Sequence, residues 1–385
     1  MTGSQLKPGW KMVKFGEVVK NANLVERDPE TNGVERIVGL EHIDPENLHI
    51  RRWNSVADGT SFTRKFVPGQ TLFGKRRAYQ RKVAYAEFEG ICSGDILTFE
   101  PKNRKVLLPE LLPFICQSDA FFDHALGTSA GSLSPRTSWT ALKDFEFPLP
   151  PLDEQKRIAE ILLAADEAFE YWKTCRAEAE NAYRLDIAVR LKAGGRGWEE
   201  KPIGQLCSFS NGRGFKSSEW SQSGYPIIRI QNLNGSREFN HFDGELEERW
   251  LVRPGQLLYA WAGVKGMSFG PRIWDGPTGG LNQHIFKIEP NSSIGKRWLF
   301  EILQLITSEV EKDAHGFKKE LVHIRKSWLT EHLIPVPPEE ERNNIEKIAC
   351  QWDKARQAIA VHIDALSELR RSIINTGLSE EALCV

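Results

Sequence analysis

The chain has 385 residues, and its 51 lysines and arginines nearly balance its 52 aspartates and glutamates. The net charge of −1 excludes a general attraction to polyanions, so any nucleic-acid contact must rest on local clusters of charge. Hydrophobic residues make up 40%, no apolar run approaches the ~20 residues of a membrane span, and the N-terminus lacks a signal-peptide core, which predicts a globular protein. The six scattered cysteines suit a reducing cytoplasm.

The two halves of the sequence are similar to each other. Six short blocks recur in the same order at separations of 186 to 190 residues. The blocks are Gly9-Trp10 and Gly197-Trp198, IVGLEHI at 37–43 and IIRIQNL at 227–233, Pro68-Gly69-Gln70 and Pro254-Gly255-Gln256, Glu100-Pro101 and Glu289-Pro290, Trp139 and Trp328, and FPLPPLDEQKRIAEIL at 147–162 and IPVPPEEERNNIEKIA at 334–349. This agreement predicts a tandem duplication.

Each copy begins with a mixed region. Short β-branched and aromatic runs are separated by glycine, proline and asparagine, and apolar helical stretches follow at 107–126 and 295–312. The pattern predicts an α+β fold class, with two mixed globules in tandem at 1–150 and 194–337. Long helices are expected to separate them.

The first globule carries a basic cluster within residues 59–86, a stretch of seven cations without an acidic residue. Lysine and arginine neutralise phosphates, while arginine, glutamine and tyrosine reach bases or sugars, so we predict DNA contacts here. The candidates are Arg64, Lys65, Lys75, Arg76, Arg77, Tyr79, Gln80, Arg81 and Lys82. The alternative is a solvated basic loop. Arg51, Arg52, Trp53 and Arg136 are weaker candidates.

A long helix is predicted over 151–193. Pro150 and Pro151 suit its start, and Gly194 suits its end. Apolar residues recur at alternating spacings of three and four, as in a coiled coil, with Asp186 as the interruption. The ladder comprises Ile158, Ile161, Ala165, Ala168, Trp172, Cys175, Ala179, Ala182 and Val189.

The second globule has the same frame and different polar residues. Its candidate DNA contacts are Arg213, Lys216, Trp261, Lys265, Lys318 and Lys319. Since these differ in type and spacing from the first cluster, the two globules are expected to recognise different sequences.

A second long helix is predicted over 338–377, after Pro337 and Pro338, with a tail at 378–385. Its ladder is interrupted by His362 and comprises Ile345, Ile348, Trp352, Ala355, Ile359, Leu366, Leu369 and Ile373. Because each stripe is only two positions wide per heptad, the helices are expected to pack on each other. The alternative is that each helix is buried against its own globule.

The sequence offers no convincing active site. The stretch GRGFKS lacks the third glycine of a dinucleotide-binding loop, and the six cysteines and nine histidines have no metal-ligand spacing. Glu154-Gln155-Lys156 could be interpreted as the end of a nuclease motif, but an acid in a first helical turn is already explained by the helix dipole. We therefore expect no catalysis and no metal or cofactor bound by this chain.

The proline-glutamine stretch resembles the conserved region of specificity subunits of type I restriction-modification systems. The matching residues are Pro148, Pro150, Pro151, Leu152, Glu154, Gln155 and Ile158. The second copy departs from the pattern at Glu339 and Arg342. The resemblance covers the whole chain, and it implies a non-catalytic subunit that reads a bipartite, asymmetric double-stranded DNA site.

The resemblance also implies partners. Modification subunits that methylate adenine N6 from S-adenosylmethionine would dock on the chain, and ATP- and Mg-dependent restriction subunits are a further implied partner. The residues of the proline signatures and spacer helices expected to serve this role are Pro150, Pro151, Gln155, Ile158, Ile161, Trp172, Pro337, Pro338, Ile345, Ile348, Trp352 and Ile359. Two other functions stay open at this stage, a stand-alone DNA-binding regulator and a coiled-coil adaptor without DNA contact.

Overall fold

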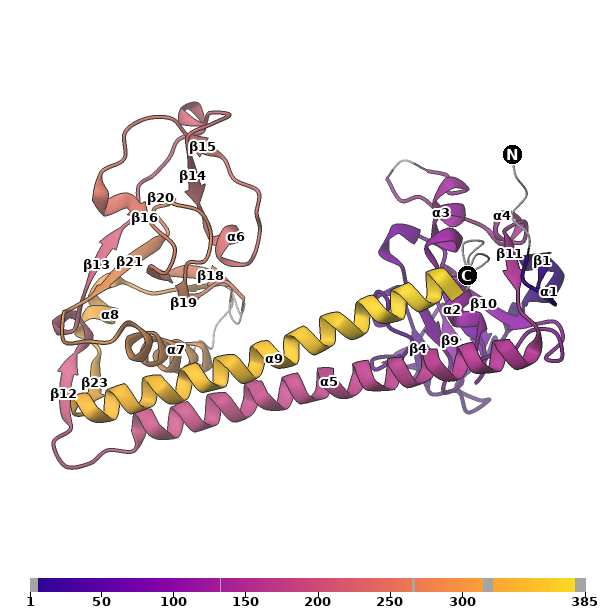
Figure 1. Cartoon of the computed structure of the whole chain (residues 1–385), viewed down its shortest axis with the longest axis horizontal. Helices are drawn as coiled ribbons and strands as arrows, with labels where there is room; N and C mark the ends of the chain where they lie inside the picture. The colour runs from indigo at the N-terminus through magenta and orange to yellow at the C-terminus, as the bar shows by residue number, and fades with distance from the viewer. Residues whose placement is uncertain (1–5, 132, 265–266, 314–320, 378–385) are drawn as a thin grey trace. The chain divides into compact units, whose positions relative to one another are not determined.

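The computed structural model describes residues 6–131, 133–264, 267–313 and 321–377. Two compact units divide the chain (Figure 1). The first unit contains residues up to Thr174 together with those from Ala360 onward, and the second contains Cys175–Ile359. Each unit therefore holds one globule and one part of each long helix.

The described strands of the first unit form three sheets. A four-stranded antiparallel sheet has the order β2 (Val19–Asn21), β10 (Ile96–Pro101), β7 (Thr71–Gly74), β8 (Val83–Tyr85). A five-stranded sheet has the order β3 (Leu24–Val25), β6 (Arg64–Phe66), β9 (Gly90–Cys92), β4 (Arg36–Val38), β5 (Asn54–Ser55), with β4 and β9 parallel. A two-stranded sheet pairs β1 (Lys11–Lys14) with β11 (Glu146–Leu149).

Short helices complete this globule. They are α1 (Phe15–Val18), α2 (Leu112–Gln117), α3 (Asp119–Gly127) and α4 (Trp139–Leu142), with 3₁₀ turns η1 (Leu40–His42), η2 (Val56–Asp58) and η3 (Ala78–Gln80). The core is aromatic: the ring of Phe15 lies 5.3 Å from that of Phe99 and 5.0 Å from that of Phe121. Burying such rings is the main stabilising contribution to a core of this kind.

In the second unit, the strands within the described ranges form four sheets. The four-stranded antiparallel sheet has the order β13 (Cys207–Asn211), β21 (Ile285–Pro290), β17 (Leu257–Ala260), β19 (Gly270–Ile273). A second sheet has the order β15 (His241–Phe242), β14 (Tyr225–Ile228), β20 (Gly279–Leu281), β16 (Leu251–Val252). The pairs are β12 (Glu199–Pro202) with β23 (Leu333–Val336), and β18 (Ala262–Val264) with β22 (Leu321–His323).

The helices of the second globule are α6 (Ile230–Leu233), α7 (Lys296–Asp313) and α8 (Lys326–Glu331), with 3₁₀ turns η4 (Ile203–Gln205), η5 (Ser217–Glu219) and η6 (Glu248–Trp250). Helix α7 lies between the sheet β13-β21-β17-β19 and the long helices of its unit (Figure 1). Its fully buried Trp298 and Leu303 join the sheet residue Tyr259 in one core. The amphipathic stretch predicted at 295–312 thus forms the central helix of this core.

The two globules repeat one topology, which confirms the predicted tandem α+β architecture. The sheet order β2-β10-β7-β8 recurs as β13-β21-β17-β19, and the parallel pair β4–β9 recurs as β14–β20. Local hydrogen bonds also recur at equivalent positions of the two globules. His42 accepts from the backbone N–H of Gly39 with Nδ1, and Asn232 accepts from that of Arg229 with Oδ1, each at 2.9 Å.

The long helices α5 (Leu152–Lys192) and α9 (Glu339–Gly377) contact each other within each unit. In the first unit Asp166 of α5 pairs with Arg370 of α9, at 2.5 Å. In the second unit Glu180 of α5 pairs with Arg356 of α9, at 2.8 Å. In both units, the polar residue that interrupts the apolar ladder of one helix also contacts a tryptophan of the other helix. The partner numbers fall in one helix as they rise in the other, so the pairing is antiparallel.

Five residues of the predicted ladders are exposed instead of buried in the helix seam: Ile161, Ala182, Val189, Ala355 and Leu369. Ile161, Val189 and Leu369 are 42%, 68% and 51% exposed. Near their ends the helices turn a different face inward, because they pack against a globule there as well as against each other. The buried residues are Ala159, Leu162, Ile187, Leu191 and Ile374.

Candidate nucleic-acid interface

A short turn forms the tip of the predicted basic cluster. The 3₁₀ turn η3 lies between Arg77 and Arg81, which both have left-handed backbone conformations, with φ of 53° and 52°. Ala78 is buried and anchors the turn, whereas Tyr79 is 56% exposed. Left-handed conformations of residues other than glycine are unfavourable, and they concentrate at functional sites. The turn therefore presents Arg77 and Tyr79 at the surface.

A neighbouring segment, residues 134–137, supports this turn. The N–H of Arg77 donates to the carbonyl of Pro135 at 2.7 Å, and the N–H of Thr137 donates to the carbonyl of Lys75 at 3.0 Å. These two backbone bonds hold the start of the turn against this segment.

Positive charge exceeds negative charge behind the tip. Asp95 accepts from Arg136 Nε at 3.0 Å and lies 3.5 Å from Arg76. Partial burial opposes the ionised form of Asp95, but Arg136, Arg76 and Lys75 together hold its pKa below the usual value. Burial, and then the charge of Arg64, lower the pKa of Lys75. One carboxylate is thus shared by several cations, an arrangement suited to a phosphate.

Other members of the predicted cluster contact their own chain. Although residues 59–86 contain no acid, the fold brings acids from elsewhere: Lys65 lies 3.2 Å from Glu89, and Arg81 lies 2.7 Å from Asp119. Lys82 donates to the carbonyl of Leu40 at 2.6 Å. Arg64 donates to the carbonyls of Gly94 and Ile96.

Three candidates in and next to the η3 turn remain available. Among the described residues, no hydrogen bond or ion pair engages the side chains of Arg77, Tyr79 and Gln80. A surface hollow beside them is lined by Pro45, Glu46, Tyr79, Gln80, Arg81 and Lys82. In this combination the arginine fits contact with a phosphate, while the tyrosine and the glutamine fit contact with sugars and base edges.

The candidates of the second unit fall into three groups. Arg213 is enclosed, with its guanidinium 4.9 Å from the ring of Phe215 and 2.5 Å from Glu219, so it stabilises its own loop. Trp261 donates to the carbonyl of Gln283 at 3.1 Å and is partly buried. Lys216 is exposed. Lys265, Lys318 and Lys319 lie outside the described residues.

Sequence reasoning missed a surface pair in the second unit. The guanidinium of Arg229 lies 4.5 Å from the ring centre of Trp220, which is 41% exposed, and Tyr225 nearby in the sequence is 40% exposed. An arginine stacked on a tryptophan presents both a fork of donors and an aromatic face to a nucleic acid. In the sequence over 216–229, a lysine and an arginine alternate with aromatic residues, and this pattern could have indicated the pair. The stretch lacks the dense run of charge that marked the first unit.

The repeated glycine-tryptophan pair fastens each long helix to its globule. Trp10 donates its indole N–H to Glu154 at 2.8 Å, and Trp198 donates to Glu341 at 2.9 Å. The glycine before each tryptophan has a φ of 83°, and a side chain at Gly9 would lie 3.0 Å from Pro151. Glu154 is therefore used as an acceptor in a structural contact.

Gln155 and Arg342, which differ between the two proline signatures, make equivalent contacts. Gln155 is buried and donates to the carbonyls of Val106 and Pro150, each at 2.8 Å. Arg342 donates to the carbonyls of Ser293 and Pro337, at 3.0 Å and 2.7 Å. The departure in the second signature thus preserves the local structure.

The described histidine, cysteine and acidic side chains do not cluster as metal ligands would, and Cys92 and Cys207 are deeply buried. Within the described ranges, no three histidine, cysteine, aspartate or glutamate side chains come together as a metal site. Burial raises the pKa of Cys92 and Cys207 to about 12, which suppresses the reactive thiolate. Over the same ranges, no helix is long and apolar enough to cross a membrane.

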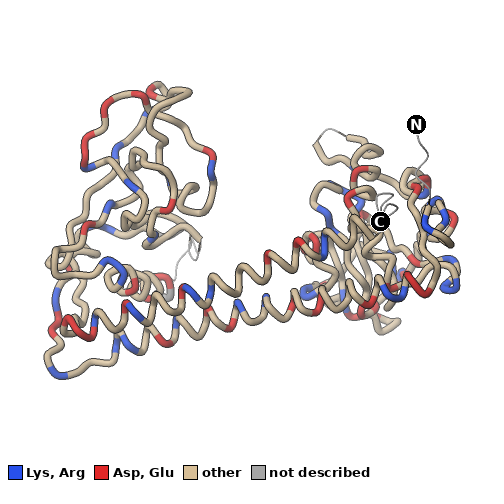
Figure 2. Tube along the Cα trace, viewed as in Figure 1, with Lys and Arg blue, Asp and Glu red and all other residues tan. Residues whose placement is uncertain are grey.

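Apolar side chains are exposed on α5. Tyr171 is 65% exposed, and Leu185 and Val189 are each 68% exposed. Leu185 and Val189 both belong to the second unit and are four residues apart, so they lie on one face of the helix. Figure 2 shows acidic and basic residues interleaved along both long helices. The exposed face is suited to another protein surface.

The repeated topology and the two helix-fastening motifs define the class of protein. The chain belongs to the family of type I restriction modification DNA specificity domains, whose family model matches residues 8–181 and again 195–366. This confirms the resemblance drawn from the proline signature and the predicted pair of recognition domains.

Three relatives are specificity subunits. The chain is 24% identical to that of the EcoBI enzyme of Escherichia coli over 189 residues, which cover 47% of this chain and 39% of the relative. It is 30% identical to that of the EcoDI enzyme of the same species over 150 residues, covering 37% and 32%. The alignments thus span roughly a third to two fifths of these relatives. The MjaVIII specificity subunit of Methanocaldococcus jannaschii is 21% identical, covering 98% and 94%.

Solved structures share the fold. A chain studied for the complex assembly and conformational transition of the type I R-M system matches with a TM-score of 0.63 and 22% identity, covering 97% of this chain and 98% of that one. The S subunit of a type I restriction-modification system from M. genitalium matches with a TM-score of 0.53 and 14% identity, covering 97% and 96%.

Proposed function

We propose that the chain is the DNA-reading subunit of a type I restriction-modification complex and that each unit reads one half of a bipartite, asymmetric site. The single observation that carries this proposal is a repeated topology with different exposed tips, in a member of the specificity family. The first unit exposes Arg77 and Tyr79, and the second exposes Lys216 and Trp220. Equivalent scaffolds with different tips suit two different half-sites.

In the first unit, the cations behind the tip and the tip itself would have different roles in DNA binding. Lys75, Arg76 and Arg136 outnumber their shared Asp95 and would neutralise phosphates. Gln80, at the end of the turn, can offer both a donor and an acceptor to a base edge. Phosphate contacts would fix the register, and the tip would supply specificity.

In the second unit, the stacked pair of Arg229 and Trp220 would serve as the reading element. Arginine is the side chain that most often reads guanine in the major groove, and a neighbouring aromatic ring limits its freedom. Lys216, at the start of the η5 turn, would contribute a phosphate contact.

The long helices would act as the spacer and the docking site. The exposed apolar face of α5 in the second unit, with Leu185 and Val189, would receive a modification subunit that methylates adenine N6. On this proposal S-adenosylmethionine is bound by that partner, and ATP and Mg by restriction subunits, in the cytoplasm. This chain contributes recognition and no catalytic step.

The experiment is a methylation assay in cells. The chain is expressed with and without the modification subunit from its source genome, and N6-methyladenine is mapped across the host DNA by single-molecule sequencing. The expected result is one motif of two dissimilar halves separated by an unread gap, only when both proteins are present. Methylation by the chain alone, or a single continuous motif, would contradict the proposal.

A further inference from the structure

We infer that the last turns of α9 position the reading turn of the first unit, so that residues near 370 determine specificity at the half-site read near residue 80. This inference rests on the proposed function. It concerns contacts inside the first unit, between segments more than 250 residues apart in the sequence.

Glu46 connects the reading turn to α9. Its N–H donates to the carbonyl of Arg81 at 3.2 Å, and its carboxylate lies 3.2 Å from Arg81 Nε. Both residues have left-handed backbones, with φ of 57° for Glu46. Such conformations persist where surrounding contacts determine them. Arg81 directly follows Tyr79 and Gln80, so its position fixes the end of the turn.

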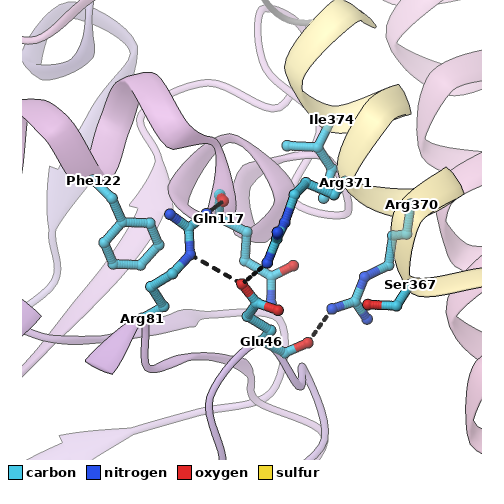
Figure 3. A pocket seen from close by; sticks show the side chains of 8 residues that line it. All are labelled: Glu46, Arg81, Gln117, Phe122, Ser367, Arg370, Arg371 and Ile374. Atoms are coloured by element: carbon cyan, nitrogen blue, oxygen red, sulfur yellow. Dashed lines mark hydrogen bonds and ion pairs between the residues drawn. The ribbon is translucent and has the colours of Figure 1, made fainter. Parts of the chain in front are cut away.

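Helix α9 holds Glu46 with two adjacent arginines (Figure 3). Arg371 Nη2 donates to the Glu46 carboxylate at 2.6 Å, and Arg370 donates to the Glu46 carbonyl. Arg370 is only 6% exposed and is itself fixed by Asp166. The backbone and the side chain of Glu46 are therefore both bound by α9.

A second connection reaches Arg81 from its other side. Asn375 donates to the Asp119 carboxylate at 2.6 Å and accepts from the Asp119 N–H at 2.9 Å. Asp119 in turn lies 2.7 Å from Arg81 Nη2. Since Ile374 is buried in the core, this stretch of α9 is packed in place. Arg81 is thus bracketed by two acids, and α9 fixes the position of both.

The pocket in Figure 3 has no spare charge for an anionic ligand. Its arginines, Arg81, Arg370 and Arg371, contact the three acids Glu46, Asp119 and Asp166. The positive and negative charges are balanced, as expected for a set of contacts that holds the reading turn in place. A binding site would leave an excess of one sign.

The repeat provides an internal comparison. Arg184 of α5 is equivalent to Arg371, at the separation of 187 residues that relates the two proline signatures. It contacts Glu180 in its own helix at 3.2 Å and is 71% exposed at its side chain. The connection through Arg371 is therefore a property of the first unit, and Arg184 is a matched control position.

The test uses the chain in complex with its modification subunit and the methylation map described above. The Gln80→Ala variant identifies which half-site belongs to the first unit. In the double variant Arg371→Ala, Asn375→Ala, discrimination at one or more bases of that half-site should fall about tenfold, while the other half-site is unchanged. Arg370 is left in place because its loss would leave Asp166 buried without its partner.

Two further variants separate positioning from general damage. Arg371→Lys keeps a cation beside Glu46, so its discrimination should equal that of the wild type. Arg184→Ala should leave discrimination at both half-sites unchanged. Unchanged discrimination in the double variant, or equal loss at both half-sites, would overturn the inference. Absence of any bipartite motif with the wild-type chain would instead overturn the proposed function, and the inference with it.

Discussion

The indole N–H of Trp352 donates to the carboxylate of Asp186, with 2.9 Å between Nε1 and Oδ2, inside the second unit. Asp186 interrupts the apolar ladder of α5, and Trp352 belongs to the ladder of α9. In the first unit His362, which interrupts the ladder of α9, stacks on Trp172 of α5 with ring centres 4.7 Å apart. Each interruption faces a tryptophan of the opposite helix. Polar contacts of this kind specify the register of paired helices.

We expect the pair of Trp352 and Asp186 to be energetically coupled. A double-mutant cycle with Trp352→Phe and Asp186→Ala should give a coupling energy of about 1 kcal/mol from urea unfolding, because the hydrogen bond involves a charged acceptor that is partly exposed. A matched cycle between Trp328→Phe and Asp186→Ala should give no coupling. Additive effects in the first cycle would show that the contact does not stabilise the helix pair.

Stability should depend on pH through His49. Its Nε2 lies 2.9 Å from Asp166 and its Nδ1 lies 2.7 Å from Glu87, and the hydrogen bond with Asp166 is the largest cause of its raised pKa. Because the folded pKa lies above the ordinary value of 6.5, the stabilising contribution of His49 is complete below pH 6.5. It is lost as the pH rises through the folded pKa.

The measurement is urea unfolding of the wild type and of His49→Gln from pH 5.5 to 9. The difference in unfolding free energy should be largest at the acidic end and should shrink as the pH rises. Arg51 lies 3.6 Å from Glu87, and Arg370 contacts Asp166, so both acids remain partnered when His49 is neutral. A difference independent of pH would contradict the assigned protonation.

The sequence predicted the architecture well, whereas the contacts that the basic residues make inside the fold could not be predicted. Repeated blocks, proline signatures and heptads depend on local chemistry, so the tandem topology and both long helices could be predicted. The pairing of Lys65 with Glu89 and of Arg81 with Asp119 depends on which segments the fold brings together. A basic run without acids therefore overstated the charge that is available for DNA.

The ends of the helix ladders could not be predicted for a similar reason. A heptad pattern assumes one partner along its whole length, whereas Ile158 and Leu162 of α5 pack into the first core, and Ile187 and Leu191 into the second. The resulting change of face exposes Val189. No local pattern contains this information, because the second partner of each helix is a globule assembled from distant strands.

We expect Arg77 to contact DNA and Lys82 to support the fold. Arg77→Ala should lower the affinity of the complex for its DNA site and reduce the slope of log affinity against log salt by up to ~0.9, as expected for one lost phosphate contact. Lys82→Ala should leave that slope unchanged, because its ammonium donates to the Leu40 carbonyl. Fluorescence anisotropy over a range of salt concentrations distinguishes the two, and equal slopes for the wild type and Arg77→Ala would remove Arg77 from the interface.

The second unit should read its half-site through Arg229. In the methylation map, Arg229→Ala should relax the preference for one base pair by about tenfold or more, the usual effect of one lost base contact. Arg237→Ala is the matched control, because Arg237 is an exposed arginine of the same unit whose guanidinium lies 3.3 Å from Asp275. Trp220→Ala should partly reproduce the effect of Arg229→Ala, since the ring 4.5 Å away orients the guanidinium. If Arg229→Ala lowers methylation equally at all sites while preserving the motif, the pair contacts phosphate and another part of the second unit reads the bases.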